Sequence, residues 1–426
     1  MLDIRFLKEN PKLVKENIRK KYQEGKLVLV DKIIENYSRV LKLKKEAEEL
    51  RHRRNKLSME INALVKRKVD ASPIIKEVKG IPGKIKDLED KKHELELEMN
   101  LRLIQIPNIM HPSVPKGKDH LQNKVIKKQG KVPKFNFQVR NHVELGEHLG
   151  ILDFDSSAET SGNGFYYLKG KLALLNQALI RFIIDFMQLK KYQYIETPLM
   201  INKKVAAAAG DLDAFEKALY KIEAEDLYLV PTAEHSLLGM HSNKTFSDED
   251  LPRKYFSYSM CFRKEIGSHG INEKGLWRTH QFNKVEQFIF CRPDESWKMY
   301  EELRKNTEQI FQKLKLPYRI LESCSGDLGN WKAKSEDLEV YRPTTKQYEE
   351  VTSLSNCADF QARDLNIKFV NKKGEKQVVH TLNNTAIATS RALVAIMESY
   401  QTKNGEIKVP AVLQKYTGFK DIEKHK

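Results

Sequence analysis

The sequence predicts an α+β protein in which a helical coiled-coil arm precedes a domain of mixed strands and helices. Two observations predict this. Apolar residues in the first hundred positions recur at alternating steps of four and three, which is the heptad pattern of a coiled coil. Beyond a proline-rich segment, short alternating strand patterns mix with helical ones. We therefore divide the 426 residues into an arm (1–104), a proline-containing linker (105–139) and a larger domain (140–426).

Two antiparallel helices are expected in the arm. The first seam, with Arg54 at one position, consists of Leu43, Ala47, Leu50, Leu57, Ile61 and Leu64. The second seam, with Lys92 at one position, consists of Val78, Ile81, Ile85, Leu88, Leu95 and Met99. The turn between the helices is predicted near residues 68–73, where Ser72 is an N-cap candidate before Pro73. Pro82 interrupts the second helical pattern, so the second helix either is kinked at this proline or starts later, and we favour the kink.

The chain is strongly basic, with 75 Lys and Arg against 58 Asp and Glu and a net charge of +17. Residues 1–100 carry 26 basic and 18 acidic side chains, and residues 39–68 carry 11 and 4. A basic rod can neutralise a nucleic-acid backbone, but a coiled coil is also a common dimerisation strut. Charge alone does not choose between these two functions.

The composition argues against a membrane protein or a secreted one. The longest stretch without a charged residue, 377–390, is 14 residues long, short of the roughly 20 apolar residues of a span. The N-terminus carries Asp3 and Glu9 and has no signal-like apolar region. The four cysteines show no C-x-x-C spacing, so we expect reduced thiols, no disulfides and no zinc site. We expect a cytoplasmic protein with no membrane partner.

A long β-hairpin is predicted from the aromatic alternation in residues 254–265 and 277–290. The intervening loop contains Gly267, Gly270 and Gly275.

Four residues of this hairpin suggest a nucleotide site. Arg263 and Glu265 are two apart on the first strand, and Phe282 and Glu286 are four apart on the second, so each pair shares a face. If the two faces coincide, a cation, an aromatic ring and two carboxylates meet, which suits phosphate, base and a metal or ammonium group. The alternative is that the charged residues form surface ion pairs and Phe282 belongs to the core.

Arg391 begins an amphipathic helix within residues 381–401. A cation in the first turn opposes the helix macrodipole, so an anionic ligand or a tertiary salt bridge is expected to hold it there. No P-loop pattern occurs in the sequence, and no G-x-G-x-x-G motif follows a strand, so an ATP site would be built from a sheet and arginines. No serine, histidine and carboxylate spacing supports nucleophilic catalysis.

Together these segments resemble seryl-tRNA synthetase, a class II aminoacyl-tRNA synthetase. The resemblance spans the whole chain through, in order, IPNIMHPSVP (106–115), YQYIETPLM (192–200, motif 1, with a dimer-interface proline at Pro198), PTAE (231–234), residues 262–287 (motif 2) and residues 381–399 (motif 3). It implies an antiparallel sheet of six to seven strands with flanking helices. It also implies ATP- and Mg²⁺-dependent activation of L-serine, transfer to tRNA(Ser) with tRNA(Sec) as a further candidate, and a homodimer.

The resemblance also assigns the site residues. Arg263 would bind the α-phosphate, Phe282 would stack on adenine, Arg391 would meet the γ-phosphate, and Glu350 with Ser353 would lie near Mg²⁺; Arg263, Arg391 and Glu350 are the implied catalytic residues. The implied ATP-binding residues are Arg263, Lys264, Glu265, Thr279, Phe282, Glu350, Val351, Thr352, Ser353 and Arg391. The implied serine-binding residues are Thr232, Ala233, Glu234, Arg263, Glu286, Asn383 and Thr385.

One departure concerns motif 3, where many bacterial members have a glycine-rich loop and this chain has Asn384, Thr385, Ala386 and Ser390. Thr385 replaces a serine and keeps the hydroxyl, and the variation resembles the archaeal-type form. A zinc-dependent form is disfavoured because the cysteines lie outside the substrate motifs.

Three other functions are weighed. An aminoacyl carrier-protein ligase would lack the basic arm. A non-catalytic paralogue that serves as an RNA-binding or scaffold protein would not be expected to keep the whole set of charged site residues, which are Arg263, Glu265, Glu286, Glu350 and Arg391. A threonine or proline synthetase is disfavoured by the T-A-E segment at 232–234 and by the arm.

Overall fold

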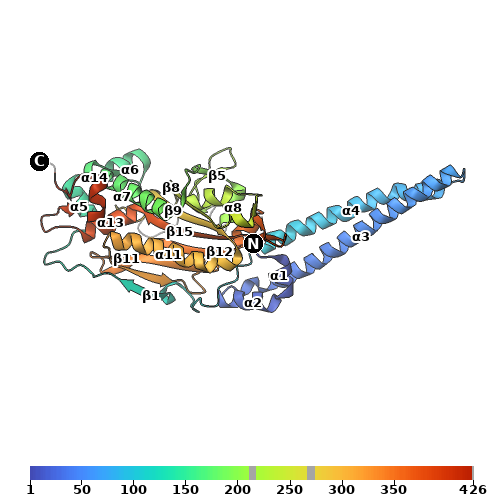
Figure 1. The fold of residues 1–426 in the computed structure, drawn as a ribbon, viewed down its shortest axis with the longest axis horizontal. Helices are drawn as coiled ribbons and strands as arrows, with labels where there is room; N and C mark the ends of the chain where they lie inside the picture. Colours follow the sequence, from blue (N-terminus) through green and yellow to red (C-terminus); the bar gives the residue numbers. More distant parts are fainter. Residues whose placement is uncertain (211–216, 266–273, 425–426) are drawn as a thin grey trace. The chain divides into compact units, whose positions relative to one another are not determined.

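The computed structural model describes residues 1–210, 217–265 and 274–424. The chain divides into two compact units, Met1–Pro107 and Asn108–Lys426 (Figure 1). Residues 108–139, which the sequence analysis assigned to a linker, fall within the second unit. The division into 1–104, 105–139 and 140–426 stays a prediction.

The first unit is helical. It contains α1 (Ile4–Glu9), α2 (Pro11–Lys20), α3 (Leu27–Lys66) and α4 (Ser72–Leu103), and α3 and α4 lie side by side as an antiparallel pair (Figure 1). All twelve apolar seam residues are buried or half-buried, and so are Arg54 and Lys92, whereas Met59 and Val65 beside the seam are exposed. The heptad prediction is therefore confirmed, because the seam is what the two helices bury against each other.

The turn lies where it was predicted, but its cap differs. Ala71 is the N-cap residue of α4, and Ser72 is already helical; the Ser72 hydroxyl donates to the carboxylate of Asp70 over 2.6 Å instead of capping the helix. Pro82 lies within α4, which runs from Ser72 without a break. The second helix therefore does not begin after Pro82, which was the alternative to a kink at this proline.

The second unit is built on a sheet of eight strands in the order β1-β10-β11-β12-β15-β9-β8-β4. Their bounds are β1 Lys124–Gln129, β10 Tyr318–Glu322, β11 Lys334–Arg342, β12 Gln347–Ala358, β15 His380–Ala388, β9 Gln281–Cys291, β8 Arg253–Phe262 and β4 Gln193–Tyr194. All neighbours are antiparallel except β4 and β8, which pair in parallel. The sheet has more strands than the expected six or seven, because β1, which lies in the predicted linker, and the short β4 are added as its two edge strands.

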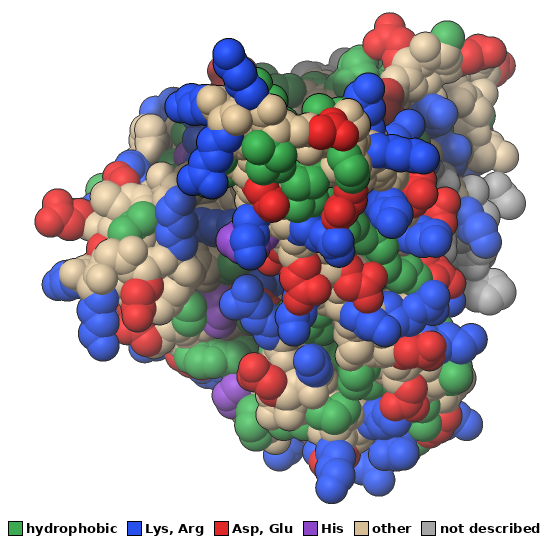
Figure 2. Space-filling view, turned by 90° about the vertical axis from the view of Figure 1, so that its right-hand side faces the viewer, with side chains coloured by type: hydrophobic (Ala, Val, Ile, Leu, Met, Phe, Trp, Pro, Cys, Tyr) green, Lys and Arg blue, Asp and Glu red, His purple; other side chains and the backbone are tan. Residues whose placement is uncertain are grey.

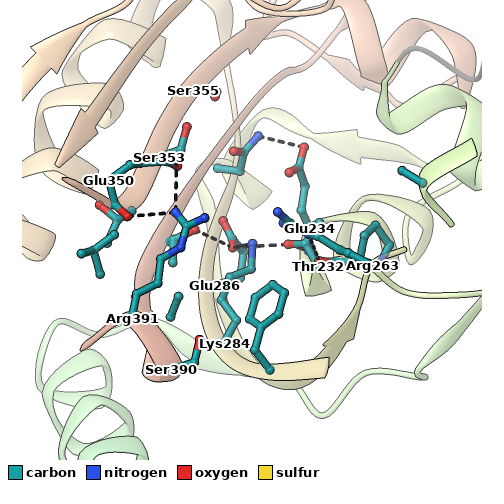
Figure 3. A pocket seen from close by; sticks show the side chains of 18 of the residues that line it. Thr232, Glu234, Arg263, Lys284, Glu286, Glu350, Ser353, Ser355, Ser390 and Arg391 are labelled. Atoms are coloured by element: carbon teal, nitrogen blue, oxygen red, sulfur yellow. Dashed lines mark hydrogen bonds and ion pairs between the residues drawn. The ribbon is translucent and has the colours of Figure 1, made fainter. Parts of the chain in front are cut away.

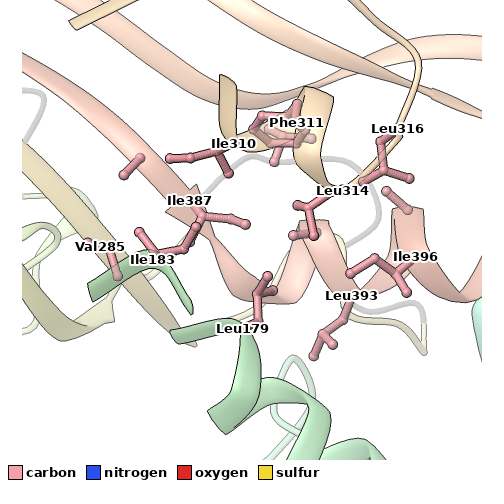
Figure 4. Packing of buried hydrophobic residues seen from close by; sticks show 14 of the residues in the cluster. Leu179, Ile183, Val285, Ile310, Phe311, Leu314, Leu316, Ile387, Leu393 and Ile396 are labelled. Atoms are coloured by element: carbon pink, nitrogen blue, oxygen red, sulfur yellow. The ribbon is translucent and has the colours of Figure 1, made fainter. Parts of the chain in front are cut away.

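Three helices cover hydrophobic faces of this sheet: α7 (Gly170–Leu189), α11 (Ser296–Lys313) and α13 (Thr389–Ser399). Leu179 and Ile183 of α7 pack in one buried cluster with Phe311 of α11 and with Ile387, at the end of β15 (Figure 4). Among the described helices, only α7 is long and apolar enough to cross a membrane, and 56% of its apolar window is buried inside the protein, as in a core helix.

Shorter elements complete the unit. The helices are α5 His142–Leu149, α6 Asp155–Ser161, α8 Lys203–Ala209, α10 Ala233–Gly239, α12 Phe360–Asp364 and α14 Gln414–Thr417. The strands are β2 Leu152–Asp153, β3 Tyr167–Leu168, β5 Met200–Asn202, β6 Leu227–Leu229, β7 Thr245–Ser247, β13 Lys368–Val370, β14 Lys376–Val378, β16 Ile407–Lys408 and β17 Asp421–Ile422.

Candidate active site

A cavity of about 470 Å³ opens over the centre of the sheet. The strands β9, β12 and β15, the first turns of α10 and α13, and the segment that follows β8 supply its walls (Figure 3). Of the residues that the sequence analysis selected, those in the lining are Thr232, Glu234, Arg263, Glu265, Thr279, Phe282, Glu286, Glu350, Val351, Thr352, Ser353, Asn383, Thr385 and Arg391. Their convergence follows from topology, because β9, β12 and β15, which are far apart in sequence, are neighbours in this sheet.

Two selected residues lie outside the lining. Ala233 is fully buried in α10, and the Lys264 ammonium lies 5.8 Å from the ring centroid of Tyr220. Residues 266–273 of the motif 2 segment, with Gly267 and Gly270 of the predicted loop, lie outside the described residues.

The two hairpin faces do coincide. Cys261 of β8 pairs with Phe282 of β9, and the Arg263 guanidinium lies 5.1 Å from the centre of the Phe282 ring. One expectation is corrected, however: β8 ends at Phe262, and Glu265 has a φ of 48°, so strand alternation does not orient this carboxylate. Arg263 still aligns with the hairpin because its N–H donates to His280 O over 2.9 Å.

Glu286 is the most enclosed carboxylate of the cavity, with an exposed fraction of 1%. It accepts hydrogen bonds of 3.3 Å from the hydroxyls of Thr232 and Thr385. Its Oε2 also lies 2.7 Å from the ammonium of Lys284, itself only 8% exposed along its side chain. A buried charge needs such partners, since its desolvation is costly.

Glu234 lies next to this group, in the first turn of α10. Its Oε1 accepts hydrogen bonds from the side-chain amides of Asn383 over 2.9 Å and Gln361 over 2.8 Å. Burial, and secondarily the negative charge of Glu286, raises the pKa of Glu234 to about 7. The end of the cavity between Glu234 and Glu286 is thus an acidic, hydroxyl-lined pocket suited to a small cation with hydrogen-bonding groups.

At the opposite side of the lining, Arg391 projects from the first turn of α13. One of its terminal nitrogens donates to Glu350 O over 2.8 Å and lies 3.3 Å from a Glu350 carboxylate oxygen. Its guanidinium also lies 5.6 Å from the ring of Trp277, whose other cationic neighbour, Arg342, is at 4.6 Å. Arg391 therefore makes a tertiary salt bridge and also lines the cavity. The two explanations that the sequence left open for it, an anionic ligand and a tertiary salt bridge, are compatible.

Oxygen donors that could hold a divalent cation with phosphates lie beside Arg391. Glu350 and Ser353 line the cavity, and Glu350 is close enough to Asp337 to contribute, after burial, to raising the pKa of that carboxyl. Carboxylate and hydroxyl oxygens suit Mg²⁺, which keeps several positions for water or phosphate. The described residues contain no group of three or more metal-ligating side chains, so phosphate oxygens would have to complete such a site.

The sequence analysis missed several residues that line the cavity or bind its lining. Lys284 could have been found, because it lies on the same face of β9 as Phe282 and Glu286, two residues from each. Trp277 and Gln361 gave no such signal. Trp277 enters the lining from the loop before β9, and Gln361 reaches Glu234 from α12, which is distant in sequence.

A catalytic unit built on an antiparallel sheet, with arginines, an aromatic ring and carboxylates on one face, defines a class II aminoacyl-tRNA synthetase. Family models agree: "tRNA synthetase class II core domain (G, H, P, S and T)" matches residues 219–400, and "Seryl-tRNA synthetase N-terminal domain" matches residues 1–110. The chain belongs to the seryl-tRNA synthetase family.

Individual relatives show the same family over the full length. The chain is 46% identical to a serine–tRNA ligase of Methanospirillum hungatei over 99% of this chain and 100% of the relative. The seryl-tRNA synthetase of Pyrococcus horikoshii, solved with ATP, superposes with a TM-score of 0.95 at 41% identity, covering 100% of both chains. The cytoplasmic enzyme of Naegleria fowleri, solved with AMP, gives 0.90 at 32% identity over 100% of this chain and 99% of that one.

Proposed function

We propose that the chain activates L-serine with ATP to form seryl-adenylate and then transfers serine to the terminal adenosine of tRNA(Ser). The observation that carries this proposal is the cavity itself, in which an acidic pocket around Glu286 adjoins Arg263 and Arg391 in a chain of the seryl-tRNA synthetase family. We include tRNA(Sec) as a second acceptor.

ATP would lie along the row from Phe282 to Arg391. The Phe282 ring would stack on adenine, Arg263 would bind the α-phosphate, and Arg391 would bind the γ-phosphate. The serine carboxylate attacks the α-phosphorus, and pyrophosphate leaves. Negative charge develops on phosphoryl oxygens in this step, so preorganised cations accelerate it without a protein nucleophile. The seryl group then passes to a ribose hydroxyl, and AMP leaves.

Serine would bind in the acidic pocket. Glu286 would meet the ammonium group, and Thr385, Thr232 and Asn383 would surround the side chain, with Glu234 available to its hydroxyl. Alanine would leave these buried polar groups without partners, which costs more than the loss of one hydrogen bond in water. The methyl group of Thr385 narrows the same space, which disfavours larger amino acids.

Mg²⁺ would bind between Glu350, Ser353 and the phosphates of ATP. Bound there, it would neutralise phosphate charge and orient the leaving pyrophosphate. Glu350 has a second role in this proposal, because its contact with Arg391 holds that guanidinium at the edge of the cavity.

The arm would bind the RNA backbone. Nine of the eleven basic side chains in residues 39–68 are exposed, whereas the apolar seam is used for helix pairing. Phosphate contacts of this kind position an RNA without reading its bases. We further propose that the chain works as a cytoplasmic homodimer with Pro198 at the subunit interface, and without a membrane partner.

Amino-acid-dependent exchange between pyrophosphate and ATP tests the catalytic proposal. Serine should support exchange, and alanine and threonine should support it at least tenfold less well. Equal exchange with all three would contradict the specificity assignment, and no exchange with any amino acid would favour a non-catalytic RNA-binding protein. Charging of purified tRNA(Ser) and tRNA(Sec) by the same preparation tests the two acceptors separately.

A further inference from the structure

The positive charge of the second unit is concentrated in one short segment. Residues 108–426 carry 48 Lys and Arg and 40 Asp and Glu, a net charge of +8. Residues 116–134, here called the basic edge, carry seven lysines and one aspartate, or +6 of that total. The rest of the unit carries 41 basic and 39 acidic side chains. Figure 2 shows the two kinds intermingled on one face of the molecule. The basic edge therefore has a local excess of positive charge that the rest of the unit does not have.

All seven lysines of the basic edge are exposed: Lys116, Lys118, Lys124, Lys127, Lys128, Lys131 and Lys134. Within the described residues only Lys127 makes an ion pair, at 2.6 Å from Glu308. The remaining six are available to an external anion. Lysines on an edge strand also prevent sheet-to-sheet aggregation, but only three of the seven belong to β1, and the other four flank it in loops.

The position of β1 connects the basic edge to the active site. Lys128 pairs with Arg319 of β10, Arg319 with Glu339 of β11, and Glu339 with Glu350 of β12. Directly opposed residues of antiparallel strands point to the same face, and Arg319 and Glu339 do form an ion pair. Lys128 thus lies on the cavity face of the sheet. Three strand spacings of about 4.8 Å place its backbone roughly 15 Å from that of Glu350.

We propose that the basic edge binds the phosphate backbone of the tRNA substrate near its acceptor end, as a second RNA contact besides the arm. The inference rests on the proposed function, because the terminal adenosine must then reach the cavity. A distance of roughly 15 Å corresponds to about four stacked nucleotides at 3.4 Å each. Backbone phosphates just before the acceptor end would therefore come within reach of the lysines. Such contacts position the RNA and carry no sequence preference.

A charge-neutralised full-length variant tests this. Lys124, Lys128, Lys131 and Lys134 are replaced by Gln, which spares the Lys127–Glu308 ion pair. The KM for tRNA(Ser) should rise about tenfold or more near physiological salt. In a plot of log KM against log salt concentration, the slope should decrease by about three, since each lost phosphate contact removes 0.7 to 0.9 from it. Serine-dependent exchange should not change.

Two controls make the result specific. Replacing the same four lysines by Arg should keep the KM for tRNA near the wild-type value. Replacing four exposed lysines elsewhere in the unit, Lys372, Lys373, Lys376 and Lys403, by Gln should also leave it within about twofold.

Three outcomes would overturn the proposal: an unchanged KM and salt slope in the basic-edge variant, an equal change in the distant control, or aggregation of the variant with normal tRNA kinetics. The last outcome would assign the lysines to edge protection alone. A wild-type chain without serine-dependent exchange would refute the proposed function instead, so the two failures are distinguishable.

Discussion

The ion pair between Lys284 and Glu286 makes a quantitative prediction. Both side chains are buried, at 8% and 2% side-chain exposure, and their charged atoms are 2.7 Å apart. Replacing Lys284 by Met keeps most of the side-chain volume but leaves the Glu286 carboxylate without its cation. The hydroxyls of Thr232 and Thr385 still donate to the carboxylate, but neutral donors do not compensate for the loss of its buried cationic partner.

Breaking a buried pair by removing one partner costs about 3–5 kcal/mol. At about 2 °C per kcal/mol for a unit of this size, K284M should unfold roughly 6–10 °C below the wild type. The double variant K284M/E286Q removes the charge as well as its partner. It should recover most of the loss, because the Gln amide oxygen can still accept from Thr232 and Thr385.

Thermal unfolding followed by circular dichroism, with K284M, E286Q and the double variant compared in one buffer, measures both effects. Serine should stabilise K284M more than the wild type, since its ammonium would replace the missing cation. The reasoning is wrong if K284M unfolds at the wild-type temperature. It is equally wrong if the double variant is no more stable than K284M.

Four further outcomes are expected. Arg263→Ala should abolish serine-dependent exchange with an unchanged circular dichroism spectrum, and retained exchange would refute its phosphate role. Removing residues 1–104 should spare exchange but prevent tRNA charging; normal charging by the shortened chain would reject the RNA-binding arm. Because the pKa of Glu234 is raised to about 7 from 4.5, the folded state holds an extra proton between these values. The unfolding free energy should fall with rising pH by at most about 1.4 kcal/mol per unit there, and E234Q should remove that slope in urea titrations. Trp277→Ala removes the ring beside Arg391, a contact worth about 0.5–1 kcal/mol, so the KM for ATP should rise about twofold to fivefold while the KM for serine stays constant.

The hairpin shows how far sequence reasoning could go for the site. Alternation in β9 correctly placed Phe282 and Glu286 on one face, since the period of a strand is a local property. The same reasoning failed for Glu265, because the chain leaves strand geometry after Phe262. Whether Arg263 and Phe282 meet depends on the register between β8 and β9, and a one-residue slip would have moved Phe282 to the other face.

The arm was largely predictable for a related reason. Its two seams are periodic, each helix is long, and the partner of each is its neighbour in sequence, so local pattern and tertiary contact coincide. The cap of α4 was not predictable at the level of one residue, because Asp70, two residues earlier, competes for the Ser72 hydroxyl.

The sequence by itself determined the elements and the chemical types at this protein's site: a heptad arm, an aromatic hairpin, an arginine opening a helix, and carboxylates without a phosphate loop. Only the tertiary structure decided which of them meet. Glu234 of α10, Lys284 and Glu286 of β9 and Asn383 of β15 surround one cavity because distant strands became sheet neighbours. The raised pKa of Glu234 and the alignment of Lys128 with Glu350 exist only after that assembly, since burial and cross-strand distance are not properties of a local segment.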